Sequence, residues 1–170
     1  MIELLILYIL NKCPSTVYSI RRNIIDKFGA VTKPSLGTIH PALKRLLEKN
    51  AVTMDKKYSD GGKKSTFYSI TKHAQEVFRD LFFQEISENP TIFYNQFAVR
   101  ILTLSMLTKD DQLEFLNNVK QHIVLHKAEI ENLLNNPYEE YDNYQKVFLT
   151  SALNNIPLML EMIESLKNDW

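Results

Sequence analysis

The segment from Ser35 to Asn50 constrains the fold more than any other part of this sequence. Its large apolar residues recur at the three-and-four spacing of one helical face, and hydroxyl and basic side chains occupy the other face. Ser35 is a suitable N-cap, and Asn50 can end the helix in the left-handed conformation. Pro41 lies inside this pattern, so we expect a strained or irregular first turn, eased by the missing side chain of Gly37.

A basic hairpin is predicted directly after this amphipathic helix. Residues 51–57 alternate apolar and polar side chains, as in a half-buried strand, and residues 66–70 form a second strand-like run. Lys63 and Lys64 lie in the Gly-Gly turn between them. A capped helix is predicted to follow over residues 72–87. Taken alone, a basic helix face or a lysine-rich loop is usually only solvated, but helix, hairpin and helix in this order are typical of a winged helix-turn-helix.

Two shorter helices are predicted before this segment. Residues 2–11 are apolar on nearly all sides and predict a buried helix, with a strand as the alternative. Residues 16–28 predict a second helix, with Gly29 just past its end. The single cysteine, Cys13, excludes an intramolecular disulfide, and we expect a free buried thiol in a reducing cytoplasm. No segment has the roughly 20 apolar residues of a membrane span, so a soluble intracellular protein is expected.

The charged residues are segregated along the chain although the formal net charge is zero. Residues 1–75 hold 13 Lys and Arg against 5 Asp and Glu, a net charge of +8, and residues 76–170 carry the compensating −8. A basic half suits a surface that neutralises phosphates, whereas an acidic half is repelled by DNA and suits self-association or ligand binding. We therefore expect one domain over residues 1–88 and a second over residues 89–170.

The acidic half is predicted to be helical throughout. A helix is expected over residues 91–107, and Thr108 caps a longer one whose apolar residues have the spacing of a coiled-coil seam. His126 is the polar member of that seam. A partly exposed histidine is the simplest interpretation, and a register-setting or pH-sensitive contact is the alternative. A last helix is expected after Pro137, with a kink caused by Pro157.

The last helix carries a continuous apolar stripe, and this half has more apolar surface than a few short helices can bury alone. We infer a homodimer that forms through the stripe. Its residues are Phe148, Ala152, Ile156, Met159, Ile163, Leu166 and Trp170. The aromatic residues of this half either fill the core and interface or line a pocket for a small aromatic or lipophilic effector, and the first interpretation is the simpler one. They include Phe93, Tyr94, Phe97, Tyr144, Phe148 and Trp170.

The segment SLGTIHPALKRL (residues 35–46), followed by YSIT (residues 68–71), resembles the signature of PadR-family transcriptional regulators. In that family a proline within the third helix, the following Ala-Leu and a basic pair recur together. His40 stands where the family usually has tyrosine, and lysines stand where its wing often carries arginine. The resemblance covers about the first half of the chain. It implies a mainly α fold with a small two-stranded β-wing, that is, an N-terminal winged helix-turn-helix and a C-terminal helical dimerisation domain.

The resemblance also implies a sequence-specific DNA-binding regulator, most simply a repressor that a small-molecule ligand relieves. A homodimer would bind a pseudo-palindromic operator in double-stranded DNA. Thr38, His40 and Arg45 are predicted to contact base edges or the groove. The predicted phosphate contacts are Tyr18, Ser35, Lys44, Lys63 and Lys64. For Tyr18 an ordinary, partly buried aromatic is an equal alternative. The alternative for the whole chain is a winged-helix module that binds a protein partner and no nucleic acid.

No pattern in the sequence indicates catalysis or a cofactor. Gly-rich phosphate loops, His-Glu-x-x-His elements, Cys/His clusters and Gly-x-Ser-x-Gly elbows are absent. His122 and His126 have a metal-compatible spacing on one predicted helix, but only glutamates could complete a site there. We therefore predict neither an enzyme nor a metal site.

Overall fold

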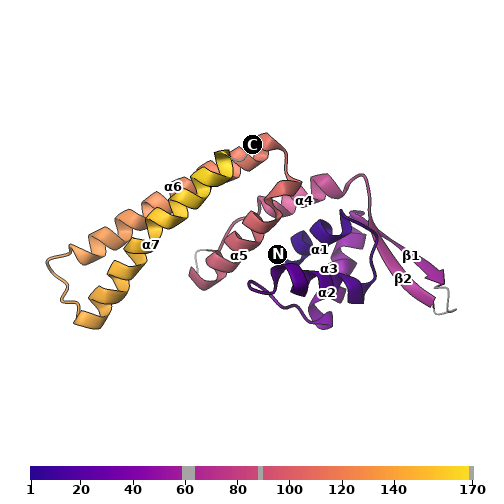
Figure 1. Cartoon of the computed structure of the whole chain (residues 1–170), viewed down its shortest axis with the longest axis horizontal. Helices are drawn as coiled ribbons and strands as arrows, with labels where there is room; N and C mark the ends of the chain where they lie inside the picture. The colour runs from indigo at the N-terminus through magenta and orange to yellow at the C-terminus, as the bar shows by residue number, and fades with distance from the viewer. Residues whose placement is uncertain (59–63, 88–89, 169–170) are drawn as a thin grey trace. The chain divides into compact units, whose positions relative to one another are not determined.

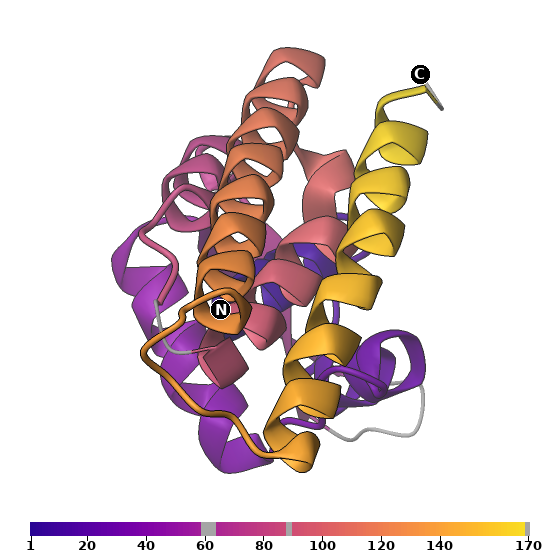
Figure 2. The ribbon, with the colours of Figure 1, turned by 90° about the vertical axis from the view of Figure 1, so that its left-hand side faces the viewer.

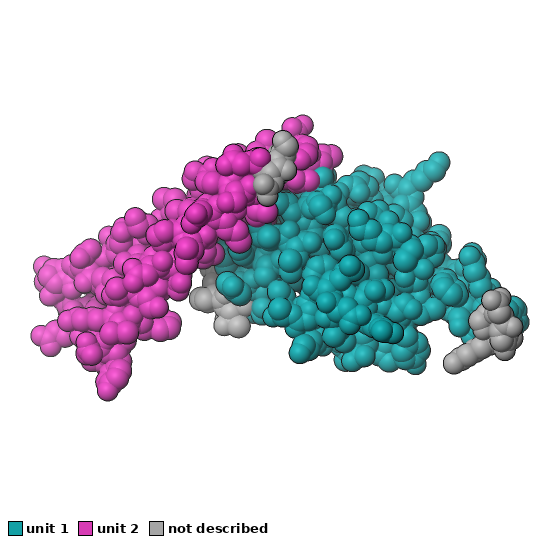
Figure 3. Space-filling model, viewed as in Figure 1, with its two compact units in different colours: residues 1–107 teal, residues 108–170 magenta. Residues whose placement is uncertain are grey.

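The computed structural model describes residues 1–58, 64–87 and 90–168. The chain forms two compact units, residues 1–107 and residues 108–170, which Figure 3 shows in different colours. In its described part, unit 1 contains five α-helices, a short 3-10 helix and a two-stranded antiparallel sheet. Unit 2 contains two long α-helices. This architecture confirms the predicted mainly α fold with a small β-wing.

The elements of unit 1 follow the predicted order (Figure 1). They are α1 (Ile2–Leu10), α2 (Val17–Phe28), α3 (Leu36–Glu48), β1 (Val52–Tyr58), β2 (Lys64–Ile70), α4 (Ala74–Phe82), α5 (Pro90–Thr103) and the 3-10 helix η1 (Leu104–Met106). The helix predicted over residues 91–107 is therefore α5 followed by η1.

Helix α1 is the centre of the core of unit 1. It contacts α2, α3, α4 and α5, so that neighbours surround it on most sides. Leu4, Ile6 and Leu7 are fully buried there. This position explains why its sequence is apolar all round, because a helix enclosed by other helices needs no polar face. The strand alternative for this segment is wrong.

Helix α3 begins where the sequence predicts. The Ser35 side chain accepts a hydrogen bond from the backbone N–H of Thr38 at 3.2 Å. The helix continues without a break through Pro41, so the expected irregular first turn is not observed. A Cβ atom added to Gly37 would meet Ser35 Oγ at 3.5 Å, an ordinary contact, so this position has room for a side chain. Asn50 adopts a φ of 54°, the predicted left-handed conformation.

Strands β1 and β2 form the hairpin that extends from the helices of unit 1 (Figure 1). Its register pairs Val52 with Ile70 and Tyr58 with Lys64. At its base, Ser15 exchanges backbone hydrogen bonds of 3.0 and 2.9 Å with Tyr68. The prediction of a half-buried β1 is wrong, since every residue after Val52 is exposed. Strand β1 lies in solvent, so the alternation of its side chains produces no buried face, whereas Tyr68 of β2 is buried.

The boundary between α4 and α5 differs from the prediction for an identifiable reason. All five apolar residues of α4 are buried as expected, but the helix ends at Phe82 and does not reach residue 87. The Arg100 guanidinium of α5 donates hydrogen bonds to the carbonyls of Phe82 at 2.6 Å and Gln84 at 2.7 Å. Because α5 also packs on α1, it belongs to unit 1, and the compact units divide after Leu107 and not near residue 88.

Unit 2 is a pair of antiparallel helices, α6 (Lys109–Leu134) and α7 (Asn143–Asn168), which lie side by side in Figures 1 and 2. Thr108 caps α6 as predicted. Within the seam, His126 is exposed and lies 3.3 Å from Glu129, which agrees with the simpler interpretation. Helix α7 contains Pro157 within a continuous helical span.

Cys13 is exposed in the connection between α1 and α2, so its expected burial is wrong. Its sulfur lies 3.8 Å from the Ser15 hydroxyl, at the edge of the unit and outside the core. Among the residues that the structure describes, no helix combines the length and apolar character required to cross a membrane.

Candidate nucleic-acid interface

The exposed face of α3 brings together three of the predicted DNA contacts. Thr38, His40 and Lys44 are exposed, whereas the opposite face of the helix is buried in the core. The buried residues are Ile39, Ala42, Leu43 and Leu46. Lys44 lies 3.8 Å from Glu48, and because both side chains are exposed this ion pair restrains the lysine only weakly. The face is therefore a rigid helical surface with polar side chains directed to solvent.

Helix α2 contributes one predicted contact and one residue that supports α3. Tyr18 is 74% exposed, so the alternative of a partly buried aromatic side chain is wrong. Arg21 donates a hydrogen bond from Nε to the carbonyl of Pro34 at 3.2 Å. Pro34 immediately precedes the N-cap of α3, so this bond holds the turn from which α3 starts. The sequence pattern gives no signal for this role of Arg21.

The wing carries more exposed lysines than the two that were predicted to hold phosphates. Lys64 is exposed, with its ammonium 5.8 Å from the centre of the Tyr58 ring, whereas Lys63 lies outside the described residues. Lys56 and Lys57 are exposed on β1. Their contribution was missed because an alternating strand suggests that one of two neighbouring side chains faces the core. Because every residue of β1 after Val52 is exposed, both lysines face solvent.

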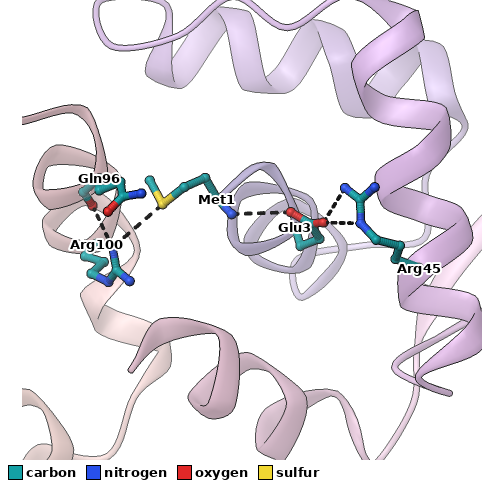
Figure 4. A network of polar contacts seen from close by, with 5 residues as sticks. All are labelled: Met1, Glu3, Arg45, Gln96 and Arg100. Atoms are coloured by element: carbon teal, nitrogen blue, oxygen red, sulfur yellow. Dashed lines mark hydrogen bonds and ion pairs between the residues drawn. The ribbon is translucent and has the colours of Figure 1, made fainter. Parts of the chain in front are cut away.

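Arg45 belongs to the same helix but is held differently from Lys44. Its guanidinium contacts one carboxylate oxygen of Glu3 in α1, from Nε at 2.7 Å and from Nη2 at 2.5 Å (Figure 4). The other carboxylate oxygen accepts from the amine of Met1 at 3.3 Å. Sequence reasoning missed this pair, since Glu3 and Arg45 are far apart in the chain and only the packing of α1 on α3 joins them.

Burial and hydrogen bonding have opposite effects on the pKa of the Glu3 carboxyl. Burial alone would raise the pKa of this carboxyl. Hydrogen bonds from its own backbone N–H and from Arg45, together with the positive charges of the Met1 amine and Arg45, outweigh burial and lower the pKa below the ordinary value. Glu3 is therefore an ionised carboxylate at neutral pH, and it neutralises Arg45 from within the protein.

Residues 6–80 match the sequence model of the Transcriptional regulator PadR-like family. This range contains α2, α3, the described strands of the wing and most of α1 and α4. It also contains the capped third helix with its internal proline, on which the resemblance was based. This segment, rather less than half of the chain, is similar to the PadR-like family. The family is one of transcriptional regulators and not of enzymes.

Solved structures of PadR-like proteins resemble the chain over half to nearly all of its length. Bacillus subtilis PadR in complex with operator DNA is 18% identical, covers 98% of this chain and 97% of that chain, and has a TM-score of 0.46. The same protein in complex with p-coumaric acid is 18% identical, with coverage of 98% and 93% and a TM-score of 0.40. A PadR-like regulator from Bacillus cereus is 25% identical over 46% of this chain and 75% of that chain, with a TM-score of 0.41. No curated protein matches significantly.

Part of the predicted dimerisation stripe is already buried within unit 2. Ile156 and Ile163 are buried, with exposed fractions of 4% and 0%. Lys120 of α6 and Glu164 of α7 form an ion pair of 2.7 Å beside them. Ala152, Met159 and Leu166 are of intermediate exposure, and Trp170 lies outside the described residues. Only Phe148 of the stripe is largely exposed, at 74%.

Other apolar residues of unit 2 face solvent instead. On α7 they are Val147, Leu158 and Met162, and on α6 they are Leu113, Val124, Leu125 and Leu133. The sequence pattern did not indicate them, because it shows on which side of a helix the apolar residues lie but not which of them contact a neighbouring helix. Which part of the stripe faces the neighbouring helix depends on how α6 and α7 pack.

Unit 1 contains a hollow of about 560 Å³ beside the start of α3. Its walls are apolar side chains of α1 and α5 and polar side chains of the α2–α3 connection and of α3 itself. The lining residues are Met1, Ile2, Leu5, Val31, Thr32, Lys33, Pro34, Ser35, Thr38, Ile92, Asn95, Gln96 and Val99. The aromatic residues proposed to line an effector pocket are not among them. Of those, Phe97 is buried and Tyr94, Tyr144 and Phe148 are exposed.

Proposed function

We propose that this PadR-like regulator binds double-stranded operator DNA as a homodimer and acts as a repressor. The observation that supports this most directly is the exposed face of α3, with Thr38, His40 and Lys44 beside a lysine-bearing hairpin. A helix of this kind fits the major groove, and a lysine-rich wing suits the phosphate backbone. Thr38 and His40 contact base edges. Tyr18, Ser35, Lys44, Lys63 and Lys64 contact phosphates.

The salt dependence of DNA binding tests this interface. Binding of the chain to a duplex from its own promoter region is measured by fluorescence anisotropy at several salt concentrations. Lys64→Ala should reduce the slope of log affinity against log salt by about 0.9, because one phosphate contact is lost. Lys146→Ala in α7 removes the same charge from an exposed residue of unit 2 and should leave the slope unchanged.

Two results would contradict the assignment. If Lys64→Ala and Lys146→Ala have the same slope as the original chain, the wing does not contact DNA. If the original chain ignores duplex DNA even at low salt, the winged helix serves another purpose, and a protein partner becomes the better explanation for its exposed face.

We further propose that a small aromatic or lipophilic molecule relieves repression. The hollow beside α3 supports this, since it combines apolar walls with hydroxyl and amide groups and is large enough for an aromatic acid. It shares Ser35 and Thr38 with the proposed DNA-binding face. Aromatic acids and lipophilic cations are therefore screened for release of the duplex and for a change in Trp170 fluorescence. A panel that produces neither effect argues against relief by a ligand.

A further inference from the structure

The positive charge of Arg45 is neutralised within the protein, because its guanidinium is paired with the carboxylate of Glu3. Arg45 is exposed and shares α3 with Lys44, so that from sequence alone both appear equally available to DNA. However, its guanidinium donates from both Nε and Nη2 to one oxygen of Glu3. Lys44 has only a contact of 3.8 Å with an exposed glutamate. The two cations of one helix therefore differ in how firmly they are held.

The Glu3 carboxylate has few other ways to satisfy its charge. Its side chain is 11% exposed, whereas the side chain of Arg45 is 51% exposed. A buried carboxylate that loses its cation incurs a large desolvation cost, which an exposed ion pair does not. Moving Arg45 onto a DNA phosphate would leave the buried Glu3 carboxylate with its own backbone N–H and the Met1 amine at 3.3 Å. The structure therefore opposes the use of Arg45 as a DNA contact.

We propose that Glu3 is a positioning residue. Its carboxylate binds the Arg45 guanidinium in place of a DNA phosphate, so that Arg45 makes no contact with DNA. This inference rests on the proposed function. The ion pair anchors α3 to α1, and it leaves base reading to Thr38 and His40 and phosphate binding to Lys44. It also removes one positive charge that would otherwise strengthen binding to every duplex equally, so Glu3 favours specific over non-specific binding.

Variants in which Glu3, Arg45 or both are replaced by uncharged glutamine test this proposal. The chain, Arg45→Gln, Glu3→Gln and the double variant are titrated with the promoter duplex and with an unrelated duplex between about 50 and 200 mM salt. Arg45→Gln should keep the original salt slope. Glu3→Gln should steepen it by about 0.9, which enlarges the loss of affinity over this range by about threefold, and should tighten binding to both duplexes at low salt. The double variant should return to the original slope.

The salt slope distinguishes this role from a merely structural one. A variant that only destabilises unit 1 changes the melting temperature and the active fraction but does not add a phosphate contact. Lys44→Ala provides the matched control on the same helix and should lower the slope by about 0.9. Circular dichroism melts of each variant establish that it is folded at the temperature of the titration.

The outcomes separate the inference from the proposed function. If Arg45→Gln lowers the slope as Lys44→Ala does, Arg45 contacts DNA and the inference is overturned, while the regulator assignment stands. A Glu3→Gln variant that is folded and has an unchanged slope overturns it as well. If Glu3→Gln does not fold, Arg45→Gln alone decides. If the original chain binds no duplex, the proposed function fails and the inference fails with it.

Discussion

At the scale of single residues, two buried charges determine how unit 1 is assembled. Glu3 joins α1 to α3 through Arg45 (Figure 4), and Arg100 joins α5 to the end of α4. Arg100 is 2% exposed, and burial lowers the pKa of its guanidinium. Its guanidinium donates hydrogen bonds to the carbonyls of Phe82, Gln84 and Gln96. These carbonyls replace the water that the guanidinium loses.

Arg100→Met should lower the free energy of unfolding by about 2–4 kcal/mol. The substitution keeps much of the apolar stem but leaves the carbonyls that follow α4 without their buried donor. Urea denaturation measures the change. Arg22→Met is the control, because the Arg22 side chain is 85% exposed and its ion pair with Asp26 spans 3.6 Å. A change of less than about 0.5 kcal/mol is expected there. Equal effects of the two substitutions would show that Arg100 does not support the core.

At the scale of elements, the helix ends show how far local sequence determines structure. Ser35 and Thr108 cap α3 and α6 as the sequence predicts, because an N-cap depends on residues only three positions apart. The end of α4 was predicted five residues too late, because its stop is provided by Arg100 from another helix. Gly29, which follows α2, and Gly37, in the first turn of α3, show the same dependence on their surroundings. The nearest atoms at each position decide whether a side chain could be added there.

Gly29→Ala should destabilise the protein, and Gly37→Ala should stabilise it. A Cβ atom at Gly29 would lie 2.4 Å from the carbonyl oxygen of Ile25, so the end of α2 would have to shift. At Gly37 the nearest atom is Ser35 Oγ at 3.5 Å, an ordinary contact, and alanine favours the helix by up to about 1 kcal/mol. Thermal and urea unfolding measure both changes. A loss of stability in Gly37→Ala would revive the view that Pro41 crowds the first turn of α3.

At the scale of the whole molecule, the two halves of the chain have opposite net charges, which matches the proposed roles of the first half in DNA binding and of the second half in dimerisation. The positive residues of the first half include the α3 and wing lysines, and the acidic second half includes the helices with exposed apolar residues. Val147, Phe148 and Leu158 are each more than 60% exposed on α7. Val147 and Phe148 are adjacent, and Leu158 lies about three turns further along the same helix. Apolar side chains so exposed on one helix are typical of a protein interface. We propose that a second copy covers them.

Phe148→Glu should convert the proposed dimer into a monomer, because pairing would bury a carboxylate without a cation. Sedimentation velocity measures the assembly, and anisotropy measures operator binding, which should weaken about tenfold or more as two linked half-site contacts become one. Tyr138→Glu is the control, since Tyr138 is 93% exposed and lies between α6 and α7. A dimer that persists in Phe148→Glu would place the interface elsewhere, and an original chain that sediments as a monomer would exclude it.

The order of the helices and strands, the caps, the buried faces of α3 and α4 and the segregation of charge all follow from the sequence. Each depends on residues that are neighbours in the chain or along one helix, and such residues determine local structure wherever the helix is placed. Tertiary packing decided the rest. It paired Arg45 with Glu3, ended α4 through Arg100, brought α5 into unit 1 and turned Ile156 and Ile163 inward. These contacts join residues that are distant in the chain. The sequence gives the chemistry of each side chain, but only the packing of the helices determines which partner it contacts.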